Sequence, residues 1–202
     1  MSTDRETLAE RLNDAYRRGA VQPLRDGLDP TDAEGAYAVQ RINTRRWQAD
    51  GRRIIGRKIG LTAEAVQKQL GVDRPDYGVL FDDMLIADGG DLLASRVLQP
   101  KAEAEVALIL ARHLNDPEAR PEVVAAATEC AVAAIEIVDS RIADWKITFA
   151  DTVADNGSSA FFVLGSERKA LAGLDLKTCG MALEINGKVV SLGAVVACLG
   201  HP

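Results

Sequence analysis

The feature that most constrains the fold of this chain is a change in its hydrophobic pattern near residue 52. Before it, apolar residues recur at helical spacing in two segments, 3–18 and 31–50. After it come short apolar runs of strand length, separated by turn residues. Grouping helices before strands is typical of the α+β class. We therefore predict a helical N-terminal region over 1–52 and a β-rich body over 53–202.

Local signals mark the ends of the two N-terminal helices. The sequence predicts one capping box at Thr3 with Glu6 and a second at Thr31 with Glu34. Gly19 follows the last apolar position of the first helix, so we expect that helix to end there.

The β-rich body contains five apolar runs of strand type. These predicted strands cover 52–61, 77–86, 104–110, 135–140 and 159–165. Short helices are predicted over 62–71 and 121–134. Asn186-Gly187 lies between two β-rich runs, "MALEI" and "KVVSLG", and this dipeptide predicts a type I′ hairpin.

Composition narrows the class of protein. With 202 residues, 47% of them hydrophobic, the chain can form one ordinary soluble domain. Its net charge of −6 weighs against nucleic-acid binding by a basic surface. The three cysteines form no CxxC pair, which favours a reducing cytoplasm. No apolar run approaches the roughly 20 residues needed to cross a bilayer, and the charged start is unlike a secretory signal.

Three glutamates stand in or beside apolar runs. In the strand-like "PKAEAEVALIL", side chains alternate sides, so Glu103 and Glu105 share one face. Glu136 lies within "AAIEIVDSR", and an ionised carboxylate in such apolar surroundings needs a partner. Convergence of the three on a hard cation, Mg²⁺ or Mn²⁺, would remove their mutual repulsion. The two histidines have no spacing typical of zinc ligands.

The pattern of glutamates leaves two plainer interpretations open. Alternating glutamates on a strand commonly form one solvated face, and this would account for Glu103 and Glu105 without a metal. Glu136 could equally form an ion pair with Arg141, five residues further along the chain. Spacing alone does not decide between these interpretations and a metal site.

Two other stretches carry groups suited to chemistry. Lys58 in "GRKIGL" lies amid glycine and isoleucine, where a partly desolvated lysine could bind an anionic substrate or move a proton. An exposed lysine at a strand edge is the alternative. In "DTVADNGSSAFF", Ser158 and Ser159 could offer hydroxyl and N–H groups to a carboxylate. As a bare pattern this stretch is a turn before a strand.

Several of these motifs occur together and in order: "GRKIGLT", "QLGVDRPDYGVLFDDM", "LQPKAEAEVALIL", "EIVDSRI" and "DTVADNGSS". On them the chain resembles the 2-oxopent-4-enoate (2-hydroxypenta-2,4-dienoate) hydratases. These belong to the hydratase/decarboxylase branch of the fumarylacetoacetate hydrolase superfamily. The resemblance covers nearly the whole chain.

The resemblance implies a fold, a site and an activity. The fold would be a mixed β-roll or distorted barrel with a helical N-terminal region. Glu103, Glu105 and Glu136 would bind Mg²⁺ or Mn²⁺, and Lys58 and Asp76 occupy positions associated with catalysis. The enzyme would add water to 2-hydroxypenta-2,4-dienoate, giving 4-hydroxy-2-oxopentanoate in meta-cleavage catabolism of aromatic compounds. Members form homo-oligomers, often pentamer-based.

Other functions stay open at this point. A 4-oxalocrotonate-type decarboxylase or a sister 2-oxo-enoate hydratase would share most of these motifs. A decarboxylase would need a cation for a second carboxylate, and Arg74 and Arg141 are the candidates in the motifs. A further alternative is a non-catalytic oligomeric partner of a companion pathway enzyme. Family members continue beyond "CLGHP", whereas this chain ends at Pro202, so we expect the C-terminal part of the β-body to be missing.

Overall fold

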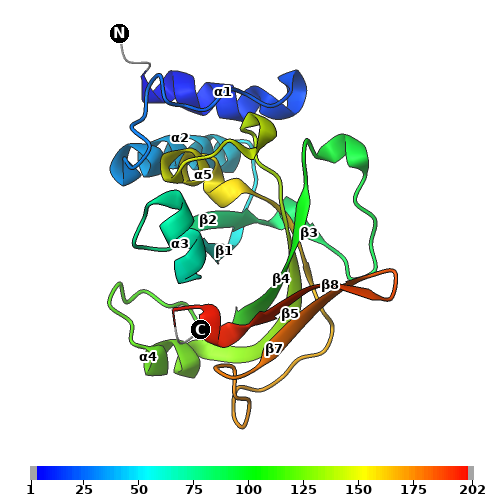
Figure 1. Ribbon diagram of the computed structural model, residues 1–202. Helices are drawn as coiled ribbons and strands as arrows, with labels where there is room; N and C mark the ends of the chain where they lie inside the picture. The colour runs from blue at the N-terminus through cyan, green and yellow to red at the C-terminus, as the bar shows by residue number, and fades with distance from the viewer. Residues whose placement is uncertain (1–3, 200–202) are drawn as a thin grey trace.

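Three helices lie against one another at one end of the molecule, as Figure 1 shows: α1 (Arg5–Arg18), α2 (Ala33–Ala49) and α5 (Phe149–Ala154). This computed structural model describes residues 4–199, apart from the side chain of Leu70. The helices share one apolar core, which includes Leu8, Leu12, Leu24, Val39, Ile142, Phe149 and Val153. Because α5 comes from the later part of the chain, the helical layer is not built from the N-terminal region alone. The division of the chain at residue 52 stays a prediction.

The helix starts differ from the sequence predictions. Asp4 is the N-cap of α1, and Thr3 of the predicted capping box lies outside the described residues. The predicted box at Thr31 is wrong, because Asp32 caps α2 and accepts a hydrogen bond from the Gly35 N–H. The Thr31 hydroxyl donates instead to Asp29. The end of α1 at Gly19, which has a positive φ of 93° that glycine adopts readily, is confirmed.

Between residues 4 and 199 the strands form three open sheets. β1 (Ile54–Gly60) pairs antiparallel with β2 (Asp76–Phe81), and β7 (Gly180–Ile185) with β8 (Lys188–Ala194). The four-stranded sheet has the order β3-β6-β5-β4, with bounds Leu85–Ile86, Ser159–Leu164, Thr128–Val138 and Lys101–Leu110. In it, β3 is parallel to β6 and the other pairs are antiparallel. The fold is thus mixed α and β, and closure into a roll or barrel stays a prediction.

One predicted helix is wrong over half its length. The run 121–134 divides into α4 (Pro121–Ala127) and the first residues of β5, which begins at Thr128. The alanines and valines of this run are compatible with a helix or a strand. From Thr128 on they form a strand because they pair with β4. The predicted strand 77–86 also breaks at Phe81, where a short 3₁₀ turn leads into β3. The short helix α3 (Glu64–Leu70) and the hairpin at Asn186-Gly187 are confirmed.

Buried polar side chains fix the helical layer to the strands. Gln40 of α2 donates hydrogen bonds of 2.9 Å to the carbonyls of Tyr77 in β2 and Val153 in α5. Trp47, nearer the end of α2, packs on a second apolar cluster, formed by Val79, Phe81, Met84 and Phe162. None of the helices between residues 4 and 199 is both long and apolar enough to span a membrane.

We expect Asp151→Ala to lower the free energy of unfolding by about 2–3 kcal/mol. The buried Asp151 carboxylate accepts from the Leu24 N–H at 2.8 Å and from the N–H and hydroxyl of Thr148 at 2.9 and 2.8 Å. Asp175→Ala is the control, because its carboxylate accepts from Thr178 in the same way at an exposed turn. Denaturant unfolding measures the free energy of unfolding of both variants. An equal loss of stability in the two would contradict the view that the buried carboxylate of Asp151 stabilises the fold by holding the Leu24 segment against the start of α5.

Candidate metal and substrate site

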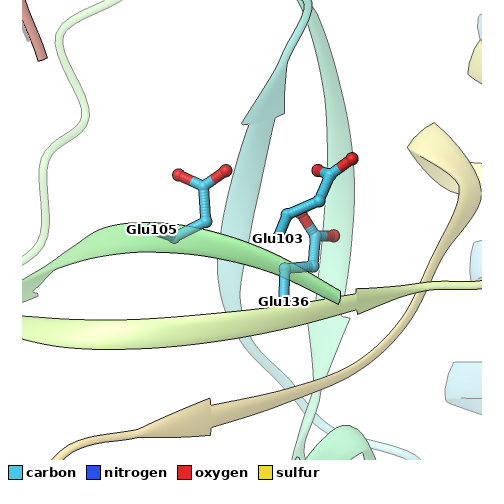
Figure 2. Close-up of side chains that lie close together, drawn as sticks. All are labelled: Glu103, Glu105 and Glu136. Carbon is cyan, nitrogen blue, oxygen red and sulfur yellow. The ribbon is translucent and has the colours of Figure 1, made fainter. Parts of the chain in front are cut away.

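Three carboxylates meet on one face of the four-stranded sheet. Glu103 of β4 lies directly opposite Glu136 of β5 in the antiparallel register, and Glu105 lies two residues along β4 on the same face. One carboxylate oxygen from each residue lies within 4.8 Å of the other two. Figure 2 shows the three side chains rising from neighbouring strands toward the same side. The structure therefore brings together the three glutamates that the sequence singles out.

Burial and mutual repulsion both act on this carboxylate cluster. Glu136 is buried, Glu105 is partly exposed and Glu103 is exposed. Burial, followed by the charges of Glu136 and Glu103, raises the pKa of Glu105 to about 7. Burial also raises the pKa of Glu136, although the nearby Lys58 ammonium opposes that shift. A cation bound between the carboxylates would stabilise their ionised forms.

Lys58 of β1 reaches this cluster. Its Nζ lies 3.3 Å from Oε2 of Glu136 and donates a 3.0 Å hydrogen bond to the carbonyl of Gly157. The lysine side chain is only 11% exposed, so its interpretation as an exposed strand-edge residue is wrong. The alternative pairing of Glu136 with Arg141 is also wrong, because Arg141 is buried in an ion pair with Asp155.

Asp76 of β2 lies beside Lys58. It is 3% exposed and stands opposite Gly60 of β1, and a Cβ added to that glycine would lie 2.3 Å from Oδ1 of Asp76 and 3.1 Å from the lysine Nζ. Burial raises the pKa of Asp76, and the Lys58 charge partly offsets this shift. Asp76 therefore holds its proton to a higher pH than an ordinary aspartate.

The two predicted serines differ in their surroundings. The hydroxyls of Ser158 and Thr152 lie 3.3 Å apart in the interior. The hydroxyl of Ser159, at the start of β6, is buried without a hydrogen-bond partner. Of the two, Ser159 thus has the hydroxyl available for a ligand.

Unsatisfied buried oxygens concentrate at the site. In the described part of the chain, three buried side-chain polar atoms lack a hydrogen-bond partner: Oδ1 of Asp76, Oε1 of Glu136 and Oγ of Ser159. Such atoms are uncommon in folded proteins because each one forfeits its hydration. All three belong to residues predicted to form the site, which points to a ligand that binds there.

Sequence reasoning missed one group of the site, the main-chain carbonyl of Gly157 that binds Lys58. This carbonyl belongs to a turn at Asn156, Gly157 and Ser158, where all three residues have positive φ. The Asn-Gly dipeptide signals such a left-handed turn. No local signal shows that the turn docks on β2, 77 residues earlier in the chain.

Comparisons with known proteins show the family of this chain. No protein-family model matches the chain. It is 55% identical over 183 residues to 2-keto-4-pentenoate hydratase 1 of Dechloromonas aromatica, an alignment that covers 91% of this chain and 70% of that protein. It is 51% identical over 195 residues to the TodF product hydratase of Pseudomonas putida, covering 96% of this chain and 73% of that protein.

A solved structure shares the fold. The 4-oxalocrotonate decarboxylase from Pseudomonas putida G7, complexed with magnesium and adipate, superposes with a TM-score of 0.90 at 35% identity. The match covers 99% of this chain and 78% of that chain. Fold and site together define a member of the hydratase/decarboxylase class of lyases. Within that class, the level of identity to the curated relatives shows that the chain belongs to the 2-keto-4-pentenoate hydratase family.

We expect Mg²⁺ to raise the melting temperature more at about pH 8 than at about pH 5.5, because metal ligation displaces protons from carboxylates. The pKa of Glu105 is about 7 in the folded protein against 4.5 for the free side chain. The metal-free fold therefore binds the extra proton between these values and loses stability as the pH rises through them. A bound cation can offset the repulsion between the carboxylates only at a pH where Glu105 has lost that proton.

Thermal unfolding with and without Mg²⁺ at the two pH values measures this effect. Glu136→Gln should abolish the Mg²⁺-induced shift, whereas Glu122→Gln, an exposed glutamate of α4, should keep it. A shift as large at the lower pH as at the higher one would contradict metal binding by these carboxylates.

Proposed function

We propose that this chain, with a bound divalent cation, adds water to 2-hydroxypenta-2,4-dienoate and releases 4-hydroxy-2-oxopentanoate. The observation that carries the proposal is the convergence of Glu103, Glu105 and Glu136 beside the partly buried Lys58 and the buried Asp76. The identity to relatives named 2-keto-4-pentenoate hydratase supports the same reaction.

The residues fit a hard cation such as Mg²⁺ or Mn²⁺. The donor set consists of carboxylate oxygens alone, which these ions prefer. Lys58 pairs with Oε2 of Glu136, and Oε1 is left without a partner. The related decarboxylase was solved with magnesium, which supports a divalent ion here. When bound, the ion would supply Lewis-acid stabilisation of the enolate charge, worth several kcal/mol.

The reaction requires two proton deliveries and one addition of water. The dienol gives up its 2-hydroxyl proton and gains a proton at C5, which yields an α,β-unsaturated ketone. The oxygen of water then bonds to C4, and its released proton is balanced by protonation at C3. Groups that hold and move protons beside the substrate are therefore needed at more than one carbon.

We assign these proton-handling tasks to Asp76 and Lys58. Asp76 has a raised pKa and an unpartnered Oδ1, so it can hold a proton and exchange it with substrate or water. Lys58, fixed between Glu136 and the Gly157 carbonyl, can orient the substrate or the reacting water with its ammonium group. The hydroxyl of Ser159 lies beside the Glu136 carboxylate, where it could bind a substrate oxygen, whereas that of Ser158 faces Thr152.

The charges around the site favour a monocarboxylate over a dicarboxylate. Arg141 is committed to Asp155, and Arg74 is exposed and pairs with Asp73. Lys101 shares its strand face with the glutamates, but its ammonium lies over the ring of Trp145. Among the described residues, Lys58 is thus the cation that contacts the cluster. A second carboxylate in a closed site would lack a partner, at a cost of several kcal/mol.

The wider setting stays a prediction. We propose that the reaction serves meta-cleavage catabolism of aromatic compounds in the cytoplasm. We also propose, from the family resemblance, that the chain forms a pentamer-based homo-oligomer and associates with a companion pathway enzyme.

We expect the protein, supplied with Mg²⁺, to consume 2-hydroxypenta-2,4-dienoate faster than 4-oxalocrotonate. The reason is that Lys58 alone cannot serve both the reacting end and a distal carboxylate. Loss of the conjugated chromophore follows both substrates, and CO₂ release is measured in parallel. Faster consumption of the dicarboxylate with stoichiometric CO₂ would make the decarboxylase function correct.

A further inference from the structure

The side chain of Lys58 packs closely against three glycines. A Cβ added to Gly78 would lie 3.1 Å from Cγ of the lysine, one on Gly157 would lie 3.1 Å from Cδ, and one on Gly60 would lie 3.1 Å from Nζ. These distances are shorter than about nine in ten real Cβ contacts, so the lysine would have to shift. The glycines therefore leave room for one extended lysine, whose ammonium ends beside Glu136.

One of these glycines, Gly157, belongs to a strained turn. Asn156, Gly157 and Ser158 have φ values of 58°, 63° and 52°, three consecutive residues in the left-handed region. This region disfavours residues other than glycine, and about 1 kcal/mol or more per such residue must be offset by the surroundings. The turn holds the carbonyl of Gly157 that accepts the hydrogen bond from Lys58.

The side chain of Asn156 holds this turn on β2. Its Oδ1 accepts from the Val79 N–H at 2.7 Å, and its Nδ2 donates to the Val79 carbonyl at 2.9 Å. The amide thus supplies both hydrogen bonds that a neighbouring strand would provide. Asn156 is 3% exposed, and its carbonyl packs so closely on Gly78 that a Cβ there would lie 2.3 Å away.

We propose that Asn156 is a positioning residue for the Lys58 ammonium, acting through the carbonyl of Gly157. The proposal rests on the proposed function for its effect on turnover. Asn156 is not itself a catalytic residue, because its amide is committed to Val79 on both sides. Asn156 affects the reaction only through the position of the Lys58 ammonium. Its effect on turnover should therefore vanish when Lys58 is replaced.

The test is a double-mutant cycle on kcat with Asn156→Ala and Lys58→Met. Lys58→Met should lose most of kcat, and Asn156→Ala about 10-fold or more, with a smaller change in KM. In the double variant, Asn156→Ala should cause no further loss, since the lysine it positions is gone. A loss by the same factor in both backgrounds, or no loss in either, would overturn the proposal.

Asn43→Ala is the matched control. Asn43 is equally buried, and its amide donates a 2.8 Å hydrogen bond to the Ala9 carbonyl within the helical layer. Its effect on kcat should be small and unchanged by Lys58→Met. Should Asn156→Ala not fold, Asn156→Asp replaces it, because the aspartate keeps the shape and removes the donor to Val79.

A second readout does not depend on turnover. Amine acetylation, mapped by mass spectrometry, should modify Lys58 several-fold faster in the Asn156 variant than in wild type or in Asn43→Ala. The exposed Lys68 provides the internal reference. Unchanged labelling of Lys58 would overturn the proposal even in a protein without hydratase activity. A wild type that fails to turn over the dienoate would instead refute the proposed function alone.

Discussion

The ion pair between Lys58 and Glu136 is the interaction on which the site depends. Glu136 is itself buried next to two further carboxylates, and an ionised group there needs a compensating charge. Lys58 supplies it at 3.3 Å through one carboxylate oxygen and leaves the other oxygen without a partner. The pair also joins the two-stranded β1-β2 sheet to the four-stranded sheet, two sheets that share no strand.

The surrounding strands and helices fix the positions of both Glu136 and Lys58. The antiparallel register of β4 and β5 places Glu103 opposite Glu136, so the cluster needs no loop to assemble it. The helical layer fixes β2 through Gln40, and the turn at Asn156 fixes β2 to β6. Positions on regular strands are held more closely than positions on loops, as a site that must place several carboxylates around one ion requires.

The sequence was sufficient to predict features that depend on local pattern. The alternation in "PKAEAEVALIL" predicted the shared face of Glu103 and Glu105, and Asn186-Gly187 predicted its hairpin. Features that depend on distant partners were missed. The second half of the predicted helix 121–134, from Thr128 on, is a strand because it pairs with β4. Glu136 paired with Lys58, 78 residues away, rather than with the nearby Arg141, and no local periodicity encodes such a choice.

The most direct test of the account is hydration of 2-hydroxypenta-2,4-dienoate by metal-stripped protein before and after addition of Mg²⁺. The account predicts that chelation abolishes loss of the dienol absorbance and that Mg²⁺ or Mn²⁺ restores it. It also predicts no restoration in Glu136→Gln, whose fold is checked by its unfolding transition. Full turnover by a preparation verified to contain no metal would contradict the account.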